Sequence, residues 1–329
     1  MGKRRYAELP FDKNGGDGAE NEFIASLRDL KKEDIGTMEK KNFKARSKKA
    51  VSIIQYVLMA VCSVVFIICL YLIADNLYDK YKGGKIYDSA ANMISPVTVG
   101  STSSMTPGSP ILDPYEMIDN EYENGSAANN NYNLDLTSIR ASLSSLKQVN
   151  SDVIGWIYVD NTRINYPLLQ SASGDSEYYL THAYTGEYLS VGSIYMVPEC
   201  DKDLSKNRNS LIYGHNIANG TMFHDVLSFD DPEIFNNSLI YIYTLEKAFI
   251  YKPLSIYETT SDYNYIQTFF SSDSEFVSFA NRVKGNSLVP NDQTVSKEDH
   301  LLTLSTCVNG GVGTPGRWAL HAKLVGIVE

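Results

Sequence analysis

The chain has 329 residues, of which 43% are hydrophobic and 21% charged, and this globular composition excludes a fully disordered or collagen-like protein. Its formal net charge of -10 at pH 7 argues against general nucleic-acid binding. The four cysteines form no CxxC pair and the five histidines no HExxH motif. The sequence therefore predicts neither a disulfide scaffold nor a zinc ribbon, and we expect no metal and no other cofactor.

Residues 1–50 are polar and basic, with 13 Lys and Arg against 9 Asp and Glu, whereas the rest of the chain is acidic. They contain no sustained apolar stripe, so we expect a mostly flexible tail. A segment around Glu22–Leu30 is the one candidate for a short helix in it.

A run of 24 residues without a charge follows, from Val51 to Ala74. A helix needs roughly 20 apolar residues to cross a bilayer, and core helices rarely stay apolar on every face for so long. We therefore predict a transmembrane signal-anchor helix over 51–74 rather than a buried core helix or a cleaved signal peptide. The basic residues just before the run predict a cytoplasmic N-terminus and a single-pass protein of the cell membrane. They are Lys40, Lys41, Lys44, Arg46, Lys48 and Lys49.

Residues 75–134 are expected to be an extracellular linker, since 83–134 is rich in Gly, Ser, Asn and Pro. Apolar residues at helical spacing over Leu136–Leu146 predict a helix that opens a globular domain over 135–329. Short β-like runs follow at Val153–Val159, Arg163–Leu169, Gly192–Met196, Ser210–Tyr213, Leu239–Tyr243, Ala248–Tyr257, Leu301–Thr306 and Arg317–Val328.

One clear helix interrupts these strands. Ser272 to Glu275 reads as a capping box, Gly285 is a natural C-cap, and an apolar stripe runs between them through Phe276, Phe279, Ala280 and Val283. A shorter helix is expected around Met222–Ser228. Many strands with few helices predict a mainly β fold, either a barrel or a sandwich.

Cys307 ends the apolar run LLTLSTC, and three roles are open to it: a disulfide with Cys200, an inert core thiol, or a nucleophile. A nucleophilic cysteine needs a base and an oxyanion stabiliser. Among the five histidines, His215 is favoured by position, because it ends another strand directly after Gly214.

Arg317 opens the final strand ten residues after Cys307, so a hairpin could return it beside the thiol, where a guanidinium can donate to an oxyanion. A solvent-facing arginine is the alternative. The intervening GVGTPG (311–316) matches GxGxxG, but Pro315 and a β pattern follow it, so we interpret it as a mobile loop rather than a nucleotide site.

The segment TLSTC at 303–307, with Arg317 ten residues on, resembles the TLxTC…R signature of the sortases. The segments 153–170, 177–186 and 211–235, the last containing the GHN of 214–216, resemble class B sortases, and the likeness covers roughly 135–329. It implies a closed β-barrel of about eight strands, with an N-terminal helix and a helix inserted between late strands. It also implies a Gram-positive cysteine transpeptidase, which cleaves a C-terminal sorting motif of secreted proteins and transfers the acyl group to an amine of peptidoglycan or its precursor.

The resemblance assigns Cys307 as nucleophile, His215 as general acid and base, and Arg317 to the oxyanion or the substrate. It places Tyr213, Ser305 and Thr306 along the substrate cleft, and it implies no cofactor. Many class B members carry an acidic residue soon after the cysteine, where this chain has VNGG (308–311). Three alternatives stay open: a pilin polymerase that uses a pilin lysine, a cysteine peptidase that uses water, and a tethered β-domain with a Cys200–Cys307 disulfide.

Overall fold

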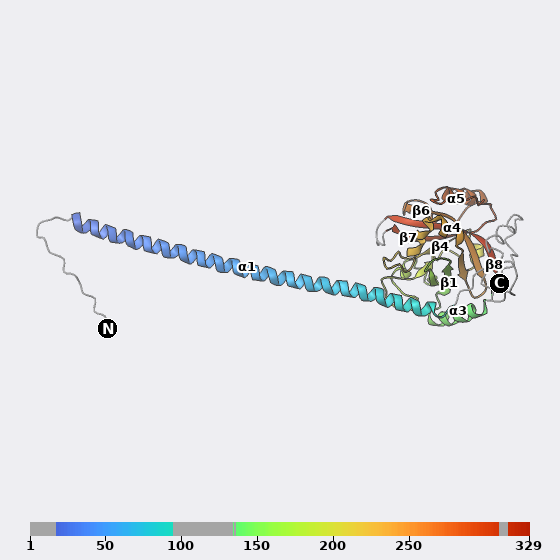
Figure 1. The fold of residues 1–329 in the computed structure, drawn as a ribbon, viewed down its shortest axis with the longest axis horizontal. Helices are drawn as coiled ribbons and strands as arrows, with labels where there is room; N and C mark the ends of the chain where they lie inside the picture. Colours follow the sequence, from blue (N-terminus) through green and yellow to red (C-terminus); the bar gives the residue numbers. More distant parts are fainter. Residues whose placement is uncertain (1–17, 95–133, 135, 309–314) are drawn as a thin grey trace. The chain divides into compact units, whose positions relative to one another are not determined.

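A computed structural model describes residues 18–94, 134, 136–308 and 315–329 (Figure 1). The chain divides into two compact units, Met1–Ala74 and Asp75–Glu329. Helix α1 (Gly18–Ala91) runs through the described part of the first unit and continues into the second.

The first unit is helical wherever it is described. One helix in the described residues is long and apolar enough to cross a membrane, and the apolar side chains of Val51–Ile73 are exposed on it. The flexible tail expected over 1–50 is wrong for residues 18–50, which also belong to α1. These residues contain no proline and many Lys, Glu and Ala, so a helix nucleated in the apolar run can extend back through them.

The second unit begins with the last turns of α1, which pack against the barrel. Tyr87 is 4% exposed, and its hydroxyl donates to the Gly192 carbonyl at 2.5 Å. The Asp79 carboxylate accepts the Ser190 amide at 2.8 Å, and Lys82 pairs with Glu187 at 2.5 Å. This differs from the linker expected over 75–134, because residues 75–94 are ordered by these contacts; residues 95–133 lie outside the described part.

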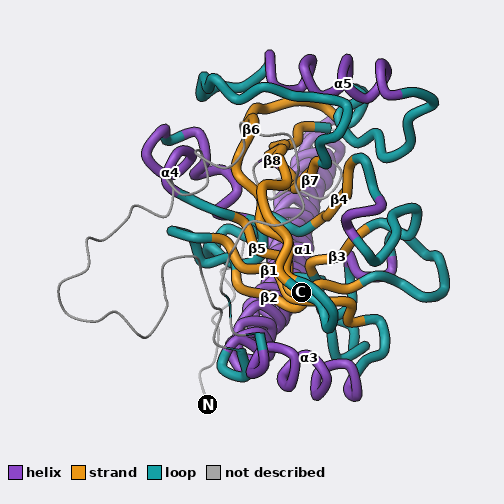
Figure 2. Tube along the Cα trace, turned by 90° about the vertical axis from the view of Figure 1, so that its right-hand side faces the viewer, coloured by secondary structure: helices purple, strands orange, loops and turns teal. Residues whose placement is uncertain are grey.

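Eight strands close into a barrel in the order β1-β2-β3-β4-β7-β8-β6-β5, which confirms the barrel expectation (Figure 2). The β2–β3 and β4–β7 pairs are parallel, and the others are antiparallel. The strands are β1 (Val153–Val159), β2 (Asn165–Leu169), β3 (Ile194–Met196), β4 (Asn209–Tyr213), β5 (Ile240–Tyr243), β6 (Ala248–Thr260), β7 (Leu301–Cys307) and β8 (Gly316–Val328).

Helices lie on opposite sides of the barrel, with α3 (Thr137–Val149) on one and α5 (Asp273–Gly285) on the other (Figure 2). The short α4 (Pro232–Asn237) and three 3-10 helices lie in the connections: η2 (Tyr178–Leu180), η3 (Leu204–Lys206) and η4 (His224–Asp230). The helix expected at Met222–Ser228 is thus the 3-10 helix η4, which begins two residues later.

The start of α5 follows the expected capping pattern, with one change of partner. The Ser272 hydroxyl accepts the Glu275 amide at 3.2 Å, but the Glu275 carboxylate accepts the Ser271 amide instead of that of Ser272. Gly285 is the last helical residue, and Asn286 is the C-cap. The predicted stripe on α5 is buried and forms a second core with the outer face of the barrel, built from Leu254, Tyr257, Tyr265, Phe276, Phe279, Ala280, Val283, Leu301 and Ala319.

The Tyr87 contact yields a prediction about stability. Tyr87→Phe should lower the free energy of unfolding by about 1–2 kcal/mol, because it leaves the buried Gly192 carbonyl without its hydroxyl donor. Tyr81→Phe, at a ring that is 59% exposed on the same helix, should change it by less than about 0.5 kcal/mol. Urea unfolding of the full chain in detergent micelles measures both. Equal stability of the two variants would mean that α1 does not stabilise the barrel through Tyr87.

Candidate active site

The parallel pairing of β4 with β7 brings His215 to the end of β7. Tyr213 is the register partner of Ser305, and the Gly214 amide donates to the Ser305 carbonyl at 3.3 Å. His215 follows Tyr213 by two residues, as Cys307 follows Ser305. Gly214 allows Ile194 and Phe223 to pack closely against this turn, because a Cβ there would collide with their side chains.

The antiparallel pairing of β7 with β8 places Arg317 directly opposite Cys307. Cross-strand partners project to the same face of a sheet, so the thiol and the guanidinium share one face at the end of the hairpin. The expected return of the chain beside Cys307 is therefore confirmed. Gly311 and Gly313 of the connecting loop lie outside the described residues.

The His215 ring is oriented by a backbone carbonyl. Its Nε2 lies 2.8 Å from the oxygen of Leu180 at the end of η2. A carbonyl oxygen can only accept, so Nε2 carries a proton in this arrangement and Nδ1 is the nitrogen that can exchange one. Nothing in the residue pattern pointed to Leu180, because its contribution comes from a backbone carbonyl.

Both cysteines of the second unit are free thiols, which contradicts the disulfide alternative. Cys200 is buried, and its sulfur lies 3.8 Å from the carbonyl of Asn209, the register partner of Leu301 at the start of β7. Cys307 is half-buried at the other end of that strand, about 20 Å away at the usual rise per residue. Burial raises the pKa of the Cys200 thiol to about 11, so this thiol stays protonated and inert.

Three tyrosines surround the end of β7. The Tyr265 hydroxyl lies 2.9 Å from the Ser305 hydroxyl, and the Tyr195 and Tyr213 rings pack 5.8 Å apart on paired strands. Burial raises the pKa of all three phenols; Cys307 adds to the rise at Tyr195 and Tyr265, while Arg317 opposes it at Tyr213 and Tyr265. Buried aromatic side chains therefore lie near the end of β7, and Tyr195 and Tyr265 are additions to the residues expected from sequence.

Ser305 and Thr306 differ in their relation to Cys307. Side chains alternate along a strand, so Ser305 shares the Cys307 face and Thr306 lies on the other. Thr306 is 2% exposed and pairs with Trp318, which belongs to the barrel core. The Thr306 side chain therefore points into the barrel core, whereas Ser305 lies on the Cys307 face, fully buried and hydrogen-bonded to Tyr265.

The other four histidines are held elsewhere. His321 is fully buried, with Nδ1 2.9 Å from the Thr303 hydroxyl and Nε2 3.0 Å from the Tyr257 hydroxyl. His182 stacks on Tyr178, His300 contacts the Asn207 carbonyl, and His224 contacts Asn216. Across residues 18–94, 134, 136–308 and 315–329, no group of three or more His, Cys, Asp or Glu could hold a metal ion.

Comparison with known proteins agrees with this geometry. The family model of the sortase domain matches residues 157–325. The chain belongs to the sortase family. Its relatives place this sortase in class B. Sortase B of Listeria monocytogenes is 33% identical over 188 residues, which cover 57% of this chain and 75% of that protein. Sortase B of Staphylococcus aureus is 32% identical over 190 residues, which cover 57% of this chain and 76% of that protein.

A solved structure shares the fold as well. The crystal structure of sortase B from Bacillus anthracis superposes with a TM-score of 0.56 at 32% identity, covering 76% of this chain and 99% of that one. The coverage of this chain exceeds the 135–329 expected for the domain, in keeping with the second unit beginning at Asp75.

Burial predicts that the two thiols of this sortase's barrel differ in reactivity. At pH 8 iodoacetamide should modify Cys307 at least tenfold faster than Cys200, because the Cys200 thiol is buried and stays protonated below about pH 11. Peptide mapping of the full chain in detergent reads each cysteine separately, and denaturation should remove the difference. Equal native rates would contradict the buried position of Cys200.

His321 predicts a component of acid sensitivity. Burial lowers the pKa of His321 to about 3 from 6.5, so unfolding takes up a proton between these pH values. The contribution of His321 to the free energy of unfolding is fully present above pH 6.5. It falls as the pH drops toward 3, by up to about 1.4 kcal/mol per pH unit. His321→Gln should flatten the pH dependence of the unfolding free energy by about that slope. His300→Gln serves as the control, and the same slope in all three proteins would disprove the assignment.

Proposed function

We propose that this sortase is a membrane-anchored cysteine transpeptidase that cleaves a C-terminal sorting motif of secreted proteins and joins it to an amine of peptidoglycan or its precursor. One observation carries the proposal: the β4–β7–β8 register gathers His215, Cys307 and Arg317 at one end of the barrel. This trio supplies a nucleophile, a proton carrier and an oxyanion donor.

Each residue then has a chemical role. The Cys307 thiolate attacks the carbonyl carbon of the scissile amide, and the Arg317 guanidinium donates to the oxygen on which negative charge develops. His215 protonates the leaving amide nitrogen as the carbon–nitrogen bond breaks, which leaves a thioester on Cys307. An incoming amine attacks the thioester, gives its proton to His215 and expels the thiolate, so that one amide replaces another.

The apolar helix supports a surface location for this reaction. In our proposal residues 51–74 span the membrane, the basic segment before them lies in the cytoplasm, and the barrel faces outward. An enzyme that shares a membrane surface with its secreted substrates and lipid-linked precursors gains effective concentration. The partners are then proteins with a sorting signal and a wall-precursor amine.

Substitutions at the trio test the chemistry. Cys307→Ala should abolish peptide transfer, while Cys200→Ala retains it, because only Cys307 shares a strand end with Arg317. Arg317→Lys should lower kcat/KM about 100-fold, since lysine lacks the planar fork that can donate to the oxyanion. Steady-state transfer of a sorting-motif peptide to triglycine by the full chain in detergent measures all three.

Intact-mass spectrometry separates the possible outcomes. The full chain is mixed with a panel of sorting-motif peptides, with and without triglycine. A peptide adduct on Cys307 that triglycine converts to ligated product supports transpeptidation. Peptide release at equal rates with and without the amine indicates a peptidase instead, and transfer that persists in Cys307→Ala refutes the nucleophile assignment.

A further inference from the structure

The backbone ladder between β4 and β7 stops one residue short of His215. Its last bond joins the Gly214 amide to the Ser305 carbonyl at 3.3 Å. If the parallel ladder continued, the amide of residue 216 would donate to the Cys307 carbonyl. The chain turns away instead, because Asn216 forms a bridge with Met222 and the His215 carbonyl accepts the Phe223 amide at 2.8 Å.

A side chain replaces the missing backbone donor. The Asn216 Nδ2 donates to the Cys307 carbonyl at 2.9 Å, and Asn216 is only 5% exposed. One amide thus extends the β4–β7 pairing past the point where the backbone leaves it. His215 lies between the Gly214–Ser305 and Asn216–Cys307 hydrogen bonds. These two bonds therefore set the distance of the His215 backbone from Cys307.

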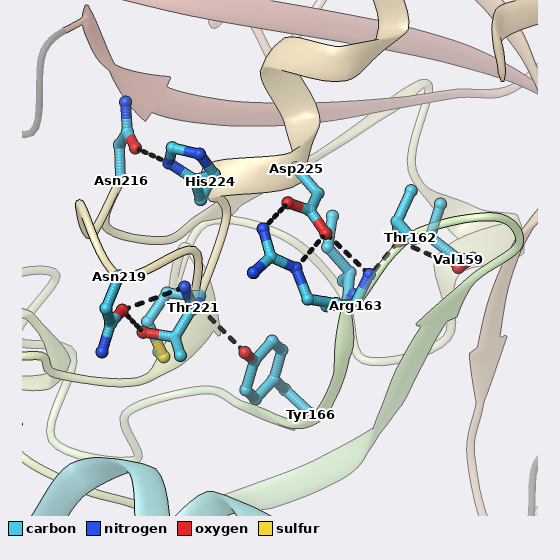
Figure 3. A network of polar contacts seen from close by, with 11 residues as sticks. Val159, Thr162, Arg163, Tyr166, Asn216, Asn219, Thr221, His224 and Asp225 are labelled. Atoms are coloured by element: carbon cyan, nitrogen blue, oxygen red, sulfur yellow. Dashed lines mark hydrogen bonds and ion pairs between the residues drawn. The ribbon is translucent and has the colours of Figure 1, made fainter. Parts of the chain in front are cut away.

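A second histidine sets the orientation of that amide. The Asn216 Oδ1 lies 2.7 Å from Nδ1 of His224 (Figure 3). A flipped amide would place an oxygen against the Cys307 carbonyl, so the carbonyl requires Nδ2 on its side and leaves Oδ1 to accept a hydrogen bond from His224 Nδ1–H. With Nδ1 protonated, His224 therefore stabilises the same amide orientation that binds Cys307.

His224 is itself fixed by its neighbours in the chain. Phe223 and Val226 are fully buried. The Asp225 carboxylate accepts two hydrogen bonds from the Arg163 guanidinium, at 3.0 and 2.6 Å, and one from the Arg163 backbone amide at 2.7 Å (Figure 3). The Tyr166 hydroxyl accepts the Met222 amide at 2.9 Å and holds the other side of the loop. The β1–β2 region thus anchors the loop that carries His215.

We propose that Asn216, oriented by His224, is a positioning residue that holds His215 and Cys307 in register for catalysis. The inference rests on the proposed transpeptidase function and extends it to two residues that need not touch substrate. Displacement of a reacting group by about 1 Å can lower a rate about 100-fold, so a single lost link at this point is enough to matter.

Asn216→Asp tests the link with almost no change in shape. The carboxylate cannot donate to the Cys307 carbonyl, so kcat should fall about 10- to 100-fold while KM changes less than about threefold. His224→Ala should lower kcat about tenfold, and His224→Gln should recover most of that loss, because its amide can donate to Asn216. His300→Ala is the matched control, since His300 makes a similar contact, 2.6 Å to the Asn207 carbonyl, before the other end of β7. Its kcat should equal that of the native chain.

Hydrogen exchange of the same full-length proteins in detergent gives a readout that needs no substrate. Peptides covering 214–223 should exchange faster in Asn216→Asp and His224→Ala than in the native chain, while those covering 153–159 should not change. Unchanged exchange in the loop, native kcat in both variants, or no rescue by His224→Gln would overturn the inference. A native chain that forms no Cys307 adduct would instead refute the proposed function, and the loop exchange would still decide whether Asn216 is the link.

Discussion

The parallel pairing of β4 with β7 is the constraint on which the site depends. Parallel neighbours cannot be joined by a tight turn, so the chain must leave β4 and return through a long crossover before β7 can pair with it. Here that crossover contains β5 and β6, which belong to the barrel, and α5, which covers part of its outer face. His215 and Cys307 therefore come to neighbouring strand ends only when most of the domain has formed.

Closure of the barrel adds rigidity where the chemistry is proposed. A closed sheet has no free edge, so β7 is paired on both sides, with β4 and with β8. Cys307 is thereby placed relative to a histidine from one neighbour and an arginine from the other. The loops supply finer adjustments through backbone groups, such as the Leu180 carbonyl at His215, and through the Asn216 amide.

Local patterns in the sequence predicted the elements well and their long-range contacts less well. The limits of β1 and the buried stripe of α5 follow from residue alternation and helical spacing, and the Cys307–Arg317 pairing follows from hairpin geometry. The contribution of Leu180 depends on a carbonyl, which leaves no trace in residue identity. The inward direction of Thr306 depends on which face of β7 lines the barrel. Residues 75–94 looked like a linker because the apolar partners of Tyr87 and Ile94 are distant in sequence.

The separation of the two barrel cysteines also bears on redox chemistry. Oxidants convert an accessible thiolate to a sulfenic acid, which is ordinarily protected when a nearby thiol condenses with it to a disulfide. Cys200 is buried at the far end of the β4–β7 pair and cannot reach Cys307. Oxidised Cys307 thus has no resolving partner within the barrel. Its recovery depends on a reductant from outside the molecule, and further oxidation to the sulfinic acid would remove the proposed nucleophile permanently.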